Sequence, residues 1–465
     1  MMAWLPALAI MLLLLGAGVV LRLSSRVLAR LFLPASLIGG LVGLLLGPQV
    51  LGAVVAAVGA RDHWLTGGLL PGDALGVMAQ LPGLAISVVF AALFLGERIP
   101  GPAEIWRIAG PQVAFGQTMA WGQYVVGLLL AILVLVPFFG LPPVSGALIE
   151  IGFEGGHGTA GGLSETFDAV GFPEGRDLAL GLATVGVVSA VVIGVALINW
   201  AARRGIIDVA ATPLPQTAAG AGHGARSLDE VVAPLSLALV FIALAIGLGW
   251  LMLKGLVLLE LRIASPDSPP ILRHMPLFPF AMIGGVIVQQ AMAAMGREGL
   301  IERLMIRAIK GLALDLLILC AVATLSLTAI GTHLVPFMLL AVAGIAWSVA
   351  CFWLLAPILM REWWFERAIA DLGQSLGMTA TGLMLLSMSD PGNRSPALAS
   401  FGAKQLLFEP IVGGGLVTAA AMPLIAAFGP WPMLAVTSLI LLFWVGLGLA
   451  LFGKKNTETV DRRAQ

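Results

Sequence analysis

A glycine-rich stretch inside an apolar region constrains this chain most. Residues Phe153–Gly162 read Phe-Glu-Gly-Gly-His-Gly-Thr-Ala-Gly-Gly and lie between the apolar runs 144–151 and 178–200. Glycine loses more backbone entropy than other residues in a helix, so five glycines in eight positions (155–162) disfavour a regular helix. Non-helical backbone at membrane depth is tolerated only where protein buries it or where a water-filled cavity faces it. The stretch therefore predicts a binding site and not a connecting loop.

Composition places this stretch in a polytopic membrane protein. Apolar residues make up 59% of the 465-residue chain and charged residues only 11%, whereas a soluble domain carries about a quarter charged residues. Cys320 and Cys351 lie in apolar runs, so we expect neither a disulfide nor a cysteine metal site. The first apolar run, residues 3–21, has no basic residue ahead of it and predicts a transmembrane helix, not a cleaved signal peptide.

Apolar runs of about 20 residues predict the membrane-spanning helices. These lie near residues 2–22, 31–51, 77–97, 108–137, 178–200, 233–256, 275–295, 309–330, 334–358, 398–428 and 431–453. Segments 144–166 and 366–388 hold the glycine-rich motifs and are expected to form re-entrant hairpins or broken helices. The predicted organisation is a first half, a cytoplasmic linker, a second half and a last helix with a cytoplasmic tail, at residues 1–201, 202–232, 233–428 and 429–465.

The distribution of basic residues gives an independent prediction of orientation. With the N-terminus outside, all but five of the 25 lysines and arginines fall on the cytoplasmic side; the exceptions are Arg61, Arg176, Lys254, Arg262 and Arg273. Such a bias is the orientation signal of polytopic membrane proteins. It predicts a periplasmic N-terminus and a cytoplasmic C-terminus, with the first hairpin entering from outside and the second from inside.

Three local matches relate the two halves. They pair Pro34 and Ile38–Gly40 with Pro279 and Ile283–Gly285, residues 83–87 with 311–315, and Thr159, Ala160 and Gly162 with Thr379, Ala380 and Gly382. The offsets shrink in order from 245 through 228 to 220, as shorter loops in the second half would produce. Because each half has an odd number of spans, five, the second copy is expected to be inverted. We therefore predict an all-α fold of two inverted five-helix repeats, an organisation typical of secondary transporters.

The stretch Gly155-Gly156-His157-Gly158-Thr159 resembles the Gly-Gly-His-Gly-Thr hairpin of the bacterial glutamate:sodium symporter family. Residues Gly373–Gly382 are similar to the second glycine-rich hairpin of that family, and Pro410-Ile411-Val412-Gly413 is similar to a Pro-x-Val-Gly stretch in its final repeat helix. Pro34, Gly39, Gly40 and Gln123 also fit the family pattern, whereas Glu154, Ser375 and Ala380 differ from it. The resemblance implies sodium-coupled uptake of glutamate or a related small carboxylate across the bacterial inner membrane, with a possible homodimer.

Substrate ligands are expected in both glycine-rich segments, because no lysine or arginine falls in the middle of a predicted span. Backbone N–H groups at half-helix starts, hydroxyls and His157 could bind a carboxylate instead. The expected substrate-binding residues are Gly155, Gly156, His157, Gly158, Thr159, Gly373, Gln374, Ser375, Gly377, Thr379 and Thr381. The alternatives are close helix packing through small residues and hydroxyls bonded to the preceding helical turn.

Buried charge points to the coupling ion. A charge at mid-membrane costs about 2.5–3.5 kcal/mol even on the lenient insertion scale, so such residues tend to be functional. We expect sodium to be bound by Glu154, Asp315, Thr159 and Thr379, with no other metal. Glu150 and Glu154 could also be solvated at a hairpin mouth. His157 could donate to a carboxylate, titrate, or tie two hairpin arms together.

Several further polar residues are expected away from the site. Asp371 is expected at the cytoplasmic mouth of the second hairpin, and Lys404 is expected to pair with Glu409 near a helix end. Glutamines in the spans, such as Gln289, are expected to form interhelical hydrogen bonds.

The sequence thus predicts a secondary active transporter that works by alternating access and uses no cofactor beyond sodium. The expected partners are the substrate, sodium and the lipid bilayer, and no nucleic acid. One alternative is a proton-coupled carrier or exchanger of another small organic anion, with Glu154 or His157 titrating. An intramembrane enzyme that uses His157 and Glu154 is disfavoured because the chain has no HExxH motif. A channel is disfavoured because a single-chain repeat provides no ring of pore-lining residues.

Overall fold

Helices form the regular structure of the described residues, which are 4–25, 33–58, 63–97, 101–207, 228–263 and 271–453 of a computed structural model. Within these ranges, eight helices are long and apolar enough to cross a membrane. The prediction of an all-α, multi-pass membrane protein is therefore confirmed. Most of the linker, residues 208–227, and the tail, residues 454–465, lie outside the described residues.

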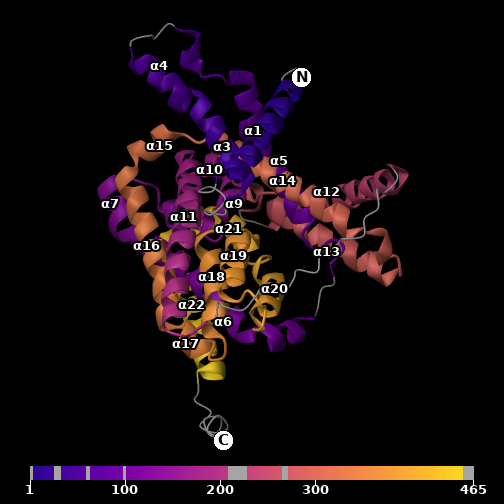
Figure 1. Cartoon of the computed structure of the whole chain (residues 1–465), viewed down its shortest axis with the longest axis vertical. Helices are drawn as coiled ribbons and strands as arrows, with labels where there is room; N and C mark the ends of the chain where they lie inside the picture. Colours follow the sequence, from indigo (N-terminus) through magenta and orange to yellow (C-terminus); the bar gives the residue numbers. More distant parts are fainter. Residues whose placement is uncertain are drawn as a thin grey trace, which may run out of the picture.

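Six helices pack into a first bundle, which Figure 1 shows at the top and on the right. Helix α3 packs against α1 and α14, α5 packs against α14 and α13, and α13 packs along α12. The bounds are α1 (Trp4–Ser24), α3 (Ala35–Leu46), α5 (Gly72–Ala91), α12 (Leu228–Ile263), α13 (Phe278–Ala294) and α14 (Arg303–Ala323). Short helix α4 (Ala53–Ala57) extends from the end of this bundle.

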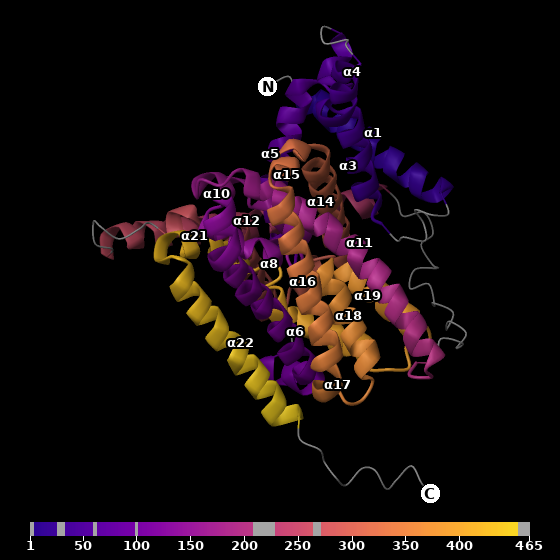
Figure 2. The same ribbon diagram turned by 90° about the vertical axis from the view of Figure 1, so that its left-hand side faces the viewer.

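The second bundle is built around α6 (Pro102–Leu130), which contacts α22 (Pro430–Phe452), α20 and α16. Figure 2 shows α22, the last helix, lying along the outside of this bundle. The other members are α7 (Val136–Phe139), α8 (Leu148–Gly152), α9 (Gly156–Gly162), α10 (Ser164–Ala169), α11 (Glu174–Arg203), α15 (Leu327–Thr332), α16 (Leu334–Leu354), α17 (Ala356–Leu359), α18 (Trp364–Leu376), α19 (Thr379–Ser389), α20 (Ala397–Phe408) and α21 (Leu416–Phe428).

Two of the predicted helices differ from the structure. The predicted span 398–428 is wrong, because residues 409–415 interrupt it between α20 and α21. Pro410 has no N–H to donate within a helix, and Gly413 and Gly414 take positive φ angles of 70° and 102°. The predicted span 309–330 also differs, because helix α14 begins earlier, at Arg303, and ends at Ala323.

Paired glycines bring the helices of the first bundle into close contact. A Cβ atom at Gly39 of α3 would lie 2.5 Å from the carbonyl oxygen of Leu14 in α1, and one at Gly40 would lie 2.9 Å from that of Leu319 in α14. On α13, Gly284 lies in the same way against the backbone of α12, and Gly285 lies against that of α5. Each of the two Gly-Gly pairs that the sequence matches at an offset of 245 therefore brings its helix against the backbones of two neighbouring helices.

The second hairpin, α18 and α19, is closed by a similar contact. A Cβ atom at Gly373 would lie 2.8 Å from the Cα atom of Gly382, and a Cβ atom at Gly382 would overlap the carbonyl oxygen of Ala370. The first hairpin comprises residues 143–169, and α21 packs against both of its ends, the turn Pro143–Ala147 and α10. Both glycine-rich segments therefore fold back on themselves, as expected.

We predict that Gly382→Ala opens the second hairpin and destabilises the protein by about 1–3 kcal/mol, the usual cost of overpacking. Gly402→Ala, in neighbouring α20, is the matched control because no atom lies within 4 Å of its added methyl group. The measurement is the apparent melting temperature of the detergent-solubilised protein. Equal melting temperatures for the two variants would show that the arms are not closely packed.

Candidate functional site

The first break in the helical backbone, residues 153–155, separates α8 from α9. Gly156 follows it with φ +66°, a conformation that a residue with a side chain rarely adopts. A Cβ atom at Gly156 would lie only 3.2 Å from the carbonyl oxygen of Gly377. Gly377 begins the second break, residues 377–378, between α18 and α19. The tips of the two hairpins therefore touch through their backbones.

The third break, residues 409–415, lies against the first hairpin. A Cβ atom at Gly414 would lie 2.6 Å from Oγ1 of Thr159, so only glycine allows this approach. Three interruptions that are distant in the sequence therefore meet at one point.

A cavity of about 370 Å³ lies where the three breaks meet. One wall is mostly apolar and comes from α5 and α14 of the first bundle. The opposite wall comes from the hairpins and the third break. The lining residues are Ile86, Val89, Phe90, Leu93, Lys310, Leu314, Leu317 and Ile318 on the first wall, and Gly155–Thr159, Met378–Ala380, Leu383, Glu409 and Gly413 on the second. A small ligand fits a cavity of this size.

A larger hollow of about 540 Å³ lies at the ends of α5, α13 and α14. Four of its lining residues already pair with one another: Arg303 lies 2.8 Å from Glu97, and the Gly96 N–H donates to Gln289 at 2.7 Å. We therefore place the candidate site in the smaller cavity. Gln289 of α13 thus bonds to the turn after α5 and not to another helix.

Glu150 is fully buried and holds the breaks together. Its Oε2 accepts a hydrogen bond from the Tyr124 hydroxyl at 2.6 Å. Its Oε1 accepts from the Thr418 hydroxyl at 2.7 Å and from the Gly413 N–H at 3.0 Å. Hydrogen bonds to a carboxylate are stronger than neutral ones. Glu150 thus joins α8 to α6, the third break and α21, and it is not solvated at a hairpin mouth.

Glu154 is also buried, with 4% of its surface exposed, but it is poorly paired. Its Oε1 accepts one hydrogen bond, from the Ser375 hydroxyl at 3.2 Å, and its Oε2 has no hydrogen-bond partner among the described residues. A buried ionised carboxylate needs a counter-charge. This oxygen is therefore available to a cation or a proton.

His157 lies in the cavity wall and bonds to α11. Its Nε2 lies 3.0 Å from Oγ1 of Thr184, whose own proton goes to the carbonyl of Leu180 at 3.0 Å. With the Thr184 proton on Leu180, Nε2 is the donor, and in the neutral ring Nδ1 is then an acceptor. Nδ1 is buried and has no partner within the described chain. His157 thus ties the first hairpin to α11, and not two hairpin arms to each other.

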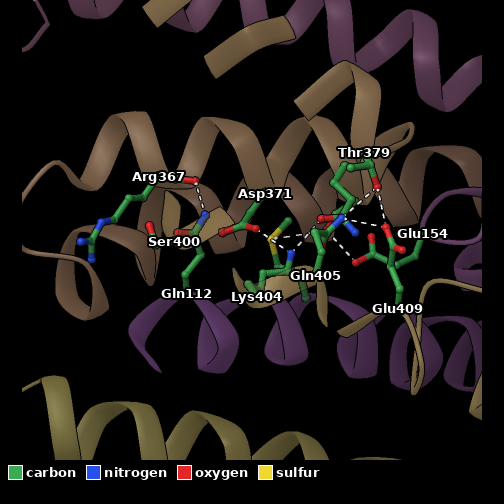
Figure 3. A network of polar contacts seen from close by, with 12 residues as sticks. Gln112, Glu154, Arg367, Asp371, Thr379, Ser400, Lys404, Gln405 and Glu409 are labelled. Carbon is green, nitrogen blue, oxygen red and sulfur yellow. Dashed lines mark hydrogen bonds and ion pairs between the residues drawn. The ribbon is translucent and has the colours of Figure 1, made fainter. Parts of the chain in front are cut away.

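A polar cluster forms the cavity edge on the side of the second hairpin. Gln405 Nε2 donates to Oγ1 of Thr379 at 2.9 Å, and the Thr379 hydroxyl donates to Glu409 at 3.2 Å. Figure 3 shows these side chains at the same end of the network as Glu154. Lys310, on the opposite wall, is the basic residue that lines the cavity.

Two expectations about charged residues are wrong. Lys404 does not pair with Glu409; its Nζ lies 2.7 Å from Oδ1 of Asp371 and 2.8 Å from Oε1 of Gln374 (Figure 3). Asp371 is fully buried in this pair and is not at the mouth of its hairpin. Lys404 was missed because the predicted span 398–428 places it near a helix end, whereas it packs against the middle of α6.

The structure brings some of the expected ligands to the cavity and not others. Gly155, Gly156, His157, Gly158, Thr159 and Thr379 line it. Asp315 does not, although Leu314 beside it does. The remaining expected ligands do not line the cavity. Gly373 and Gly377 make close packing contacts, and Thr381 lies close to Gly377. Gln374 accepts a hydrogen bond from Lys404, and Ser375 donates one to Glu154. Glu409 and Gly413 were missed, though Pro410 followed by three consecutive glycines, 413–415, signals a helix interruption.

Comparison with protein-family models and with curated proteins gives no match for this chain. Among the described residues, no group of three or more His, Cys, Asp or Glu side chains could hold a metal ion.

We predict that Thr418→Val destabilises the protein by about 1–3 kcal/mol, because it removes a donor from the buried Glu150 carboxylate and the acceptor of the Gly414 N–H. Thr437→Val is the control, since that hydroxyl bonds only to carbonyls of its own helix, α22. Apparent melting temperatures in detergent are the readout. A loss no larger than that of the control would contradict the role given to Glu150.

Proposed function

We propose that this protein is a secondary transporter that moves glutamate or a related small carboxylate together with sodium across the bacterial inner membrane. The observation that carries the proposal is the meeting of two glycine-rich hairpins, through Gly156 and Gly377, at a cavity between two helix bundles. Broken helices that meet at a ligand site are typical of secondary transporters. The corresponding Gly-Gly contacts of α3 and α13 support the proposed inverted repeats.

The cavity offers partners for a small carboxylate substrate. Lys310 supplies a positive charge on one wall, and the hydroxyl groups of Thr159 and Thr379 lie on the other. The acceptors Glu409 and His157 Nδ1 suit an ammonium group on the same substrate. An amino acid with a second carboxylate satisfies both sets.

Sodium coupling is assigned to Glu154, since its Oε2 is buried without a hydrogen-bond partner in the described part of the chain. A bound sodium ion would neutralise this carboxylate, and its release would leave the charge uncompensated. A proton could do the same, so proton coupling is the second candidate. The enzyme alternative lacks support, because His157 bonds to Thr184 and Glu154 bonds to Ser375, and not to each other.

The structure also suggests which side of the carrier is open. The cavity reaches Leu93 near the end of α5 and Lys310 near the start of α14, and the proposed topology places both ends in the cytoplasm. On the opposite side, α11 is joined to the segment after α14: Arg176 donates to Thr324 at 2.9 Å, and Asp177 accepts from the Ser326 N–H at 3.0 Å. We assign an inward-facing state, which alternating access would exchange for an outward-facing one.

The general test is a thermal-shift panel of amino acids and dicarboxylates, each with and without sodium. A ligand that binds only the folded state raises its apparent stability. The proposal requires at least one small carboxylate whose effect is larger in sodium. A panel without any such ligand, together with no uptake into proteoliposomes under a sodium or a proton gradient, would overturn it.

We predict that Glu154→Gln raises the half-saturating sodium concentration about tenfold or more, equivalent to about 1.4 kcal/mol of binding free energy. Expression should change less, because the amide has the shape of the carboxylic acid. Glu165→Gln, an exposed change on the same hairpin, is the control. Uptake is measured over a range of sodium concentrations at constant ionic strength. An unchanged sodium dependence would remove Glu154 from the ion site.

We predict that substrate protects a cysteine placed in the cavity wall. The native Cys320 and Cys351 are both buried, so an Ala380→Cys variant offers one accessible thiol in the cavity. Its rate of modification by a methanethiosulfonate reagent should fall at least about tenfold at saturating substrate, because substrate in the cavity keeps the reagent from the thiol. Asp168→Cys, at an exposed position of α10, should react at the same rate with and without substrate. Equal protection of both thiols would place the substrate elsewhere.

A further inference from the structure

The side chain of Lys404 is enclosed in protein, with 0% of it exposed. Its ammonium contacts Oδ1 of Asp371 and Oε1 of Gln374, both on α18. It also lies 4.1 Å from the ring centre of Phe408 and 5.3 Å from that of Phe401, within the range of cation–π attraction. The ammonium therefore has the surroundings of a bound small cation: a carboxylate oxygen, an amide oxygen and two aromatic rings.

The neighbouring helix leaves space for this ammonium. A Cβ atom at Gly116 of α6 would lie 2.9 Å from Nζ of Lys404, so a larger residue there would displace it. Asp371 needs the positive charge, because its other carboxylate oxygen is buried and has no hydrogen-bond partner among the described residues. A buried charge of this kind is costly when it is unpaired. The site between α6, α18 and α20 therefore requires a cation.

The Lys404 site lies next to the carboxylate that we assign to the coupling ion. Gln374 accepts from Lys404, and the next residue, Ser375, donates to Glu154. Ser375 is fixed from behind, because Gln123 of α6 donates to its carbonyl oxygen at 2.8 Å. Gln374 of α18 therefore contacts the ammonium of Lys404, a cation that is fixed covalently to the chain. The adjacent residue, Ser375, contacts the carboxylate of Glu154, which has no ion-pair partner among the described residues.

We propose that the ammonium group of Lys404 is a tethered cation that fills a binding site for a small monovalent cation, formed by Asp371, Gln374 and the rings of Phe401 and Phe408. Because the lysine cannot leave, this site stays filled while Glu154 exchanges its ion with solution. The exchange of an ion at Glu154 rests on the proposed transport function. The filling of the Asp371 site by the Lys404 ammonium concerns only the folded protein, and it is tested without transport.

The experiment removes the tethered cation and supplies a free one. Lys404→Ala should lower the apparent melting temperature, and n-propylammonium should restore it in a saturable manner, because this ion replaces the atoms that the substitution removes. A small shift with sodium or methylammonium is also expected. The neutral analogue 1-propanol should have no effect. The wild-type protein should not respond to n-propylammonium, since its site is filled.

Two further variants separate a cation site from a purely structural side chain. Lys404→Met fills the space without a charge, so it should be destabilised and should not respond to the amine. The double variant Asp371→Asn, Lys404→Ala removes the demand for a cation, so it should fold without the amine and should not respond to it.

The proposal would be overturned if n-propylammonium stabilised the wild-type protein and Lys404→Ala equally, or if Lys404→Met responded as Lys404→Ala does. It would also be overturned if Lys404→Ala could not be recovered folded in any of the cations while the double variant folds. These measurements do not use substrate. An absence of uptake by the wild-type protein would therefore contradict the proposed function and leave the tethered cation standing.

Discussion

The carboxylate of Glu150 receives hydrogen bonds from a tyrosine hydroxyl on α6, a threonine hydroxyl on α21 and a backbone N–H of the third break. Interrupting a helix in apolar surroundings frees backbone groups that must find partners within the protein. A buried carboxylate, for its part, must be supplied with donors. At Glu150 the N–H freed by the third break donates to the buried carboxylate, so both groups gain a partner. The first hairpin and the third break therefore hold one another in place. The cavity exists because this contact keeps the breaks together.

The two walls of the cavity differ in a way that suits relative motion. The wall from α5 and α14 is mostly aliphatic and aromatic, with Lys310 at its edge. The wall from the hairpins carries the hydroxyls, His157 and Glu409. Apolar surfaces make no directional bonds, so the second bundle could slide along the first without breaking a hydrogen bond at each step. Ligand groups would then travel with the polar wall.

The sequence was sufficient to predict an all-α multi-pass membrane protein and the first two breaks that border the cavity, but not the charge pairs near them. Runs of about 20 apolar residues mark spans, and Gly155–Gly162 marks the first break, because hydrophobicity and glycine content are local properties. Pairing is not local. Lys404 and Asp371 are 33 residues apart in sequence, and nothing near Lys404 indicates that α18 lies against it. Pro410 and the three glycines 413–415 indicate the third break. The sequence analysis nevertheless predicts one helix there, because residues 398–428 are apolar enough for a single span.

The glycines of α3 and α13 contact their neighbours differently from Gly161 and Gly162, which lie between the bundles, and this difference bears on how the protein could move. Within the first bundle, glycines of α3 and α13 lie against backbone carbonyls, and within the second, Gly186 of α11 lies against that of Leu376. Between the bundles, Gly161 and Gly162 face the side chains of Pro82, Ala321 and Ile86. Backbone contacts cannot adjust without moving a whole helix, whereas side chains such as isoleucine can change rotamer. The backbone contacts of α3 and α13 therefore oppose a rearrangement within the first bundle more strongly than the side-chain contacts of Gly161 and Gly162 oppose a displacement of one bundle along the other.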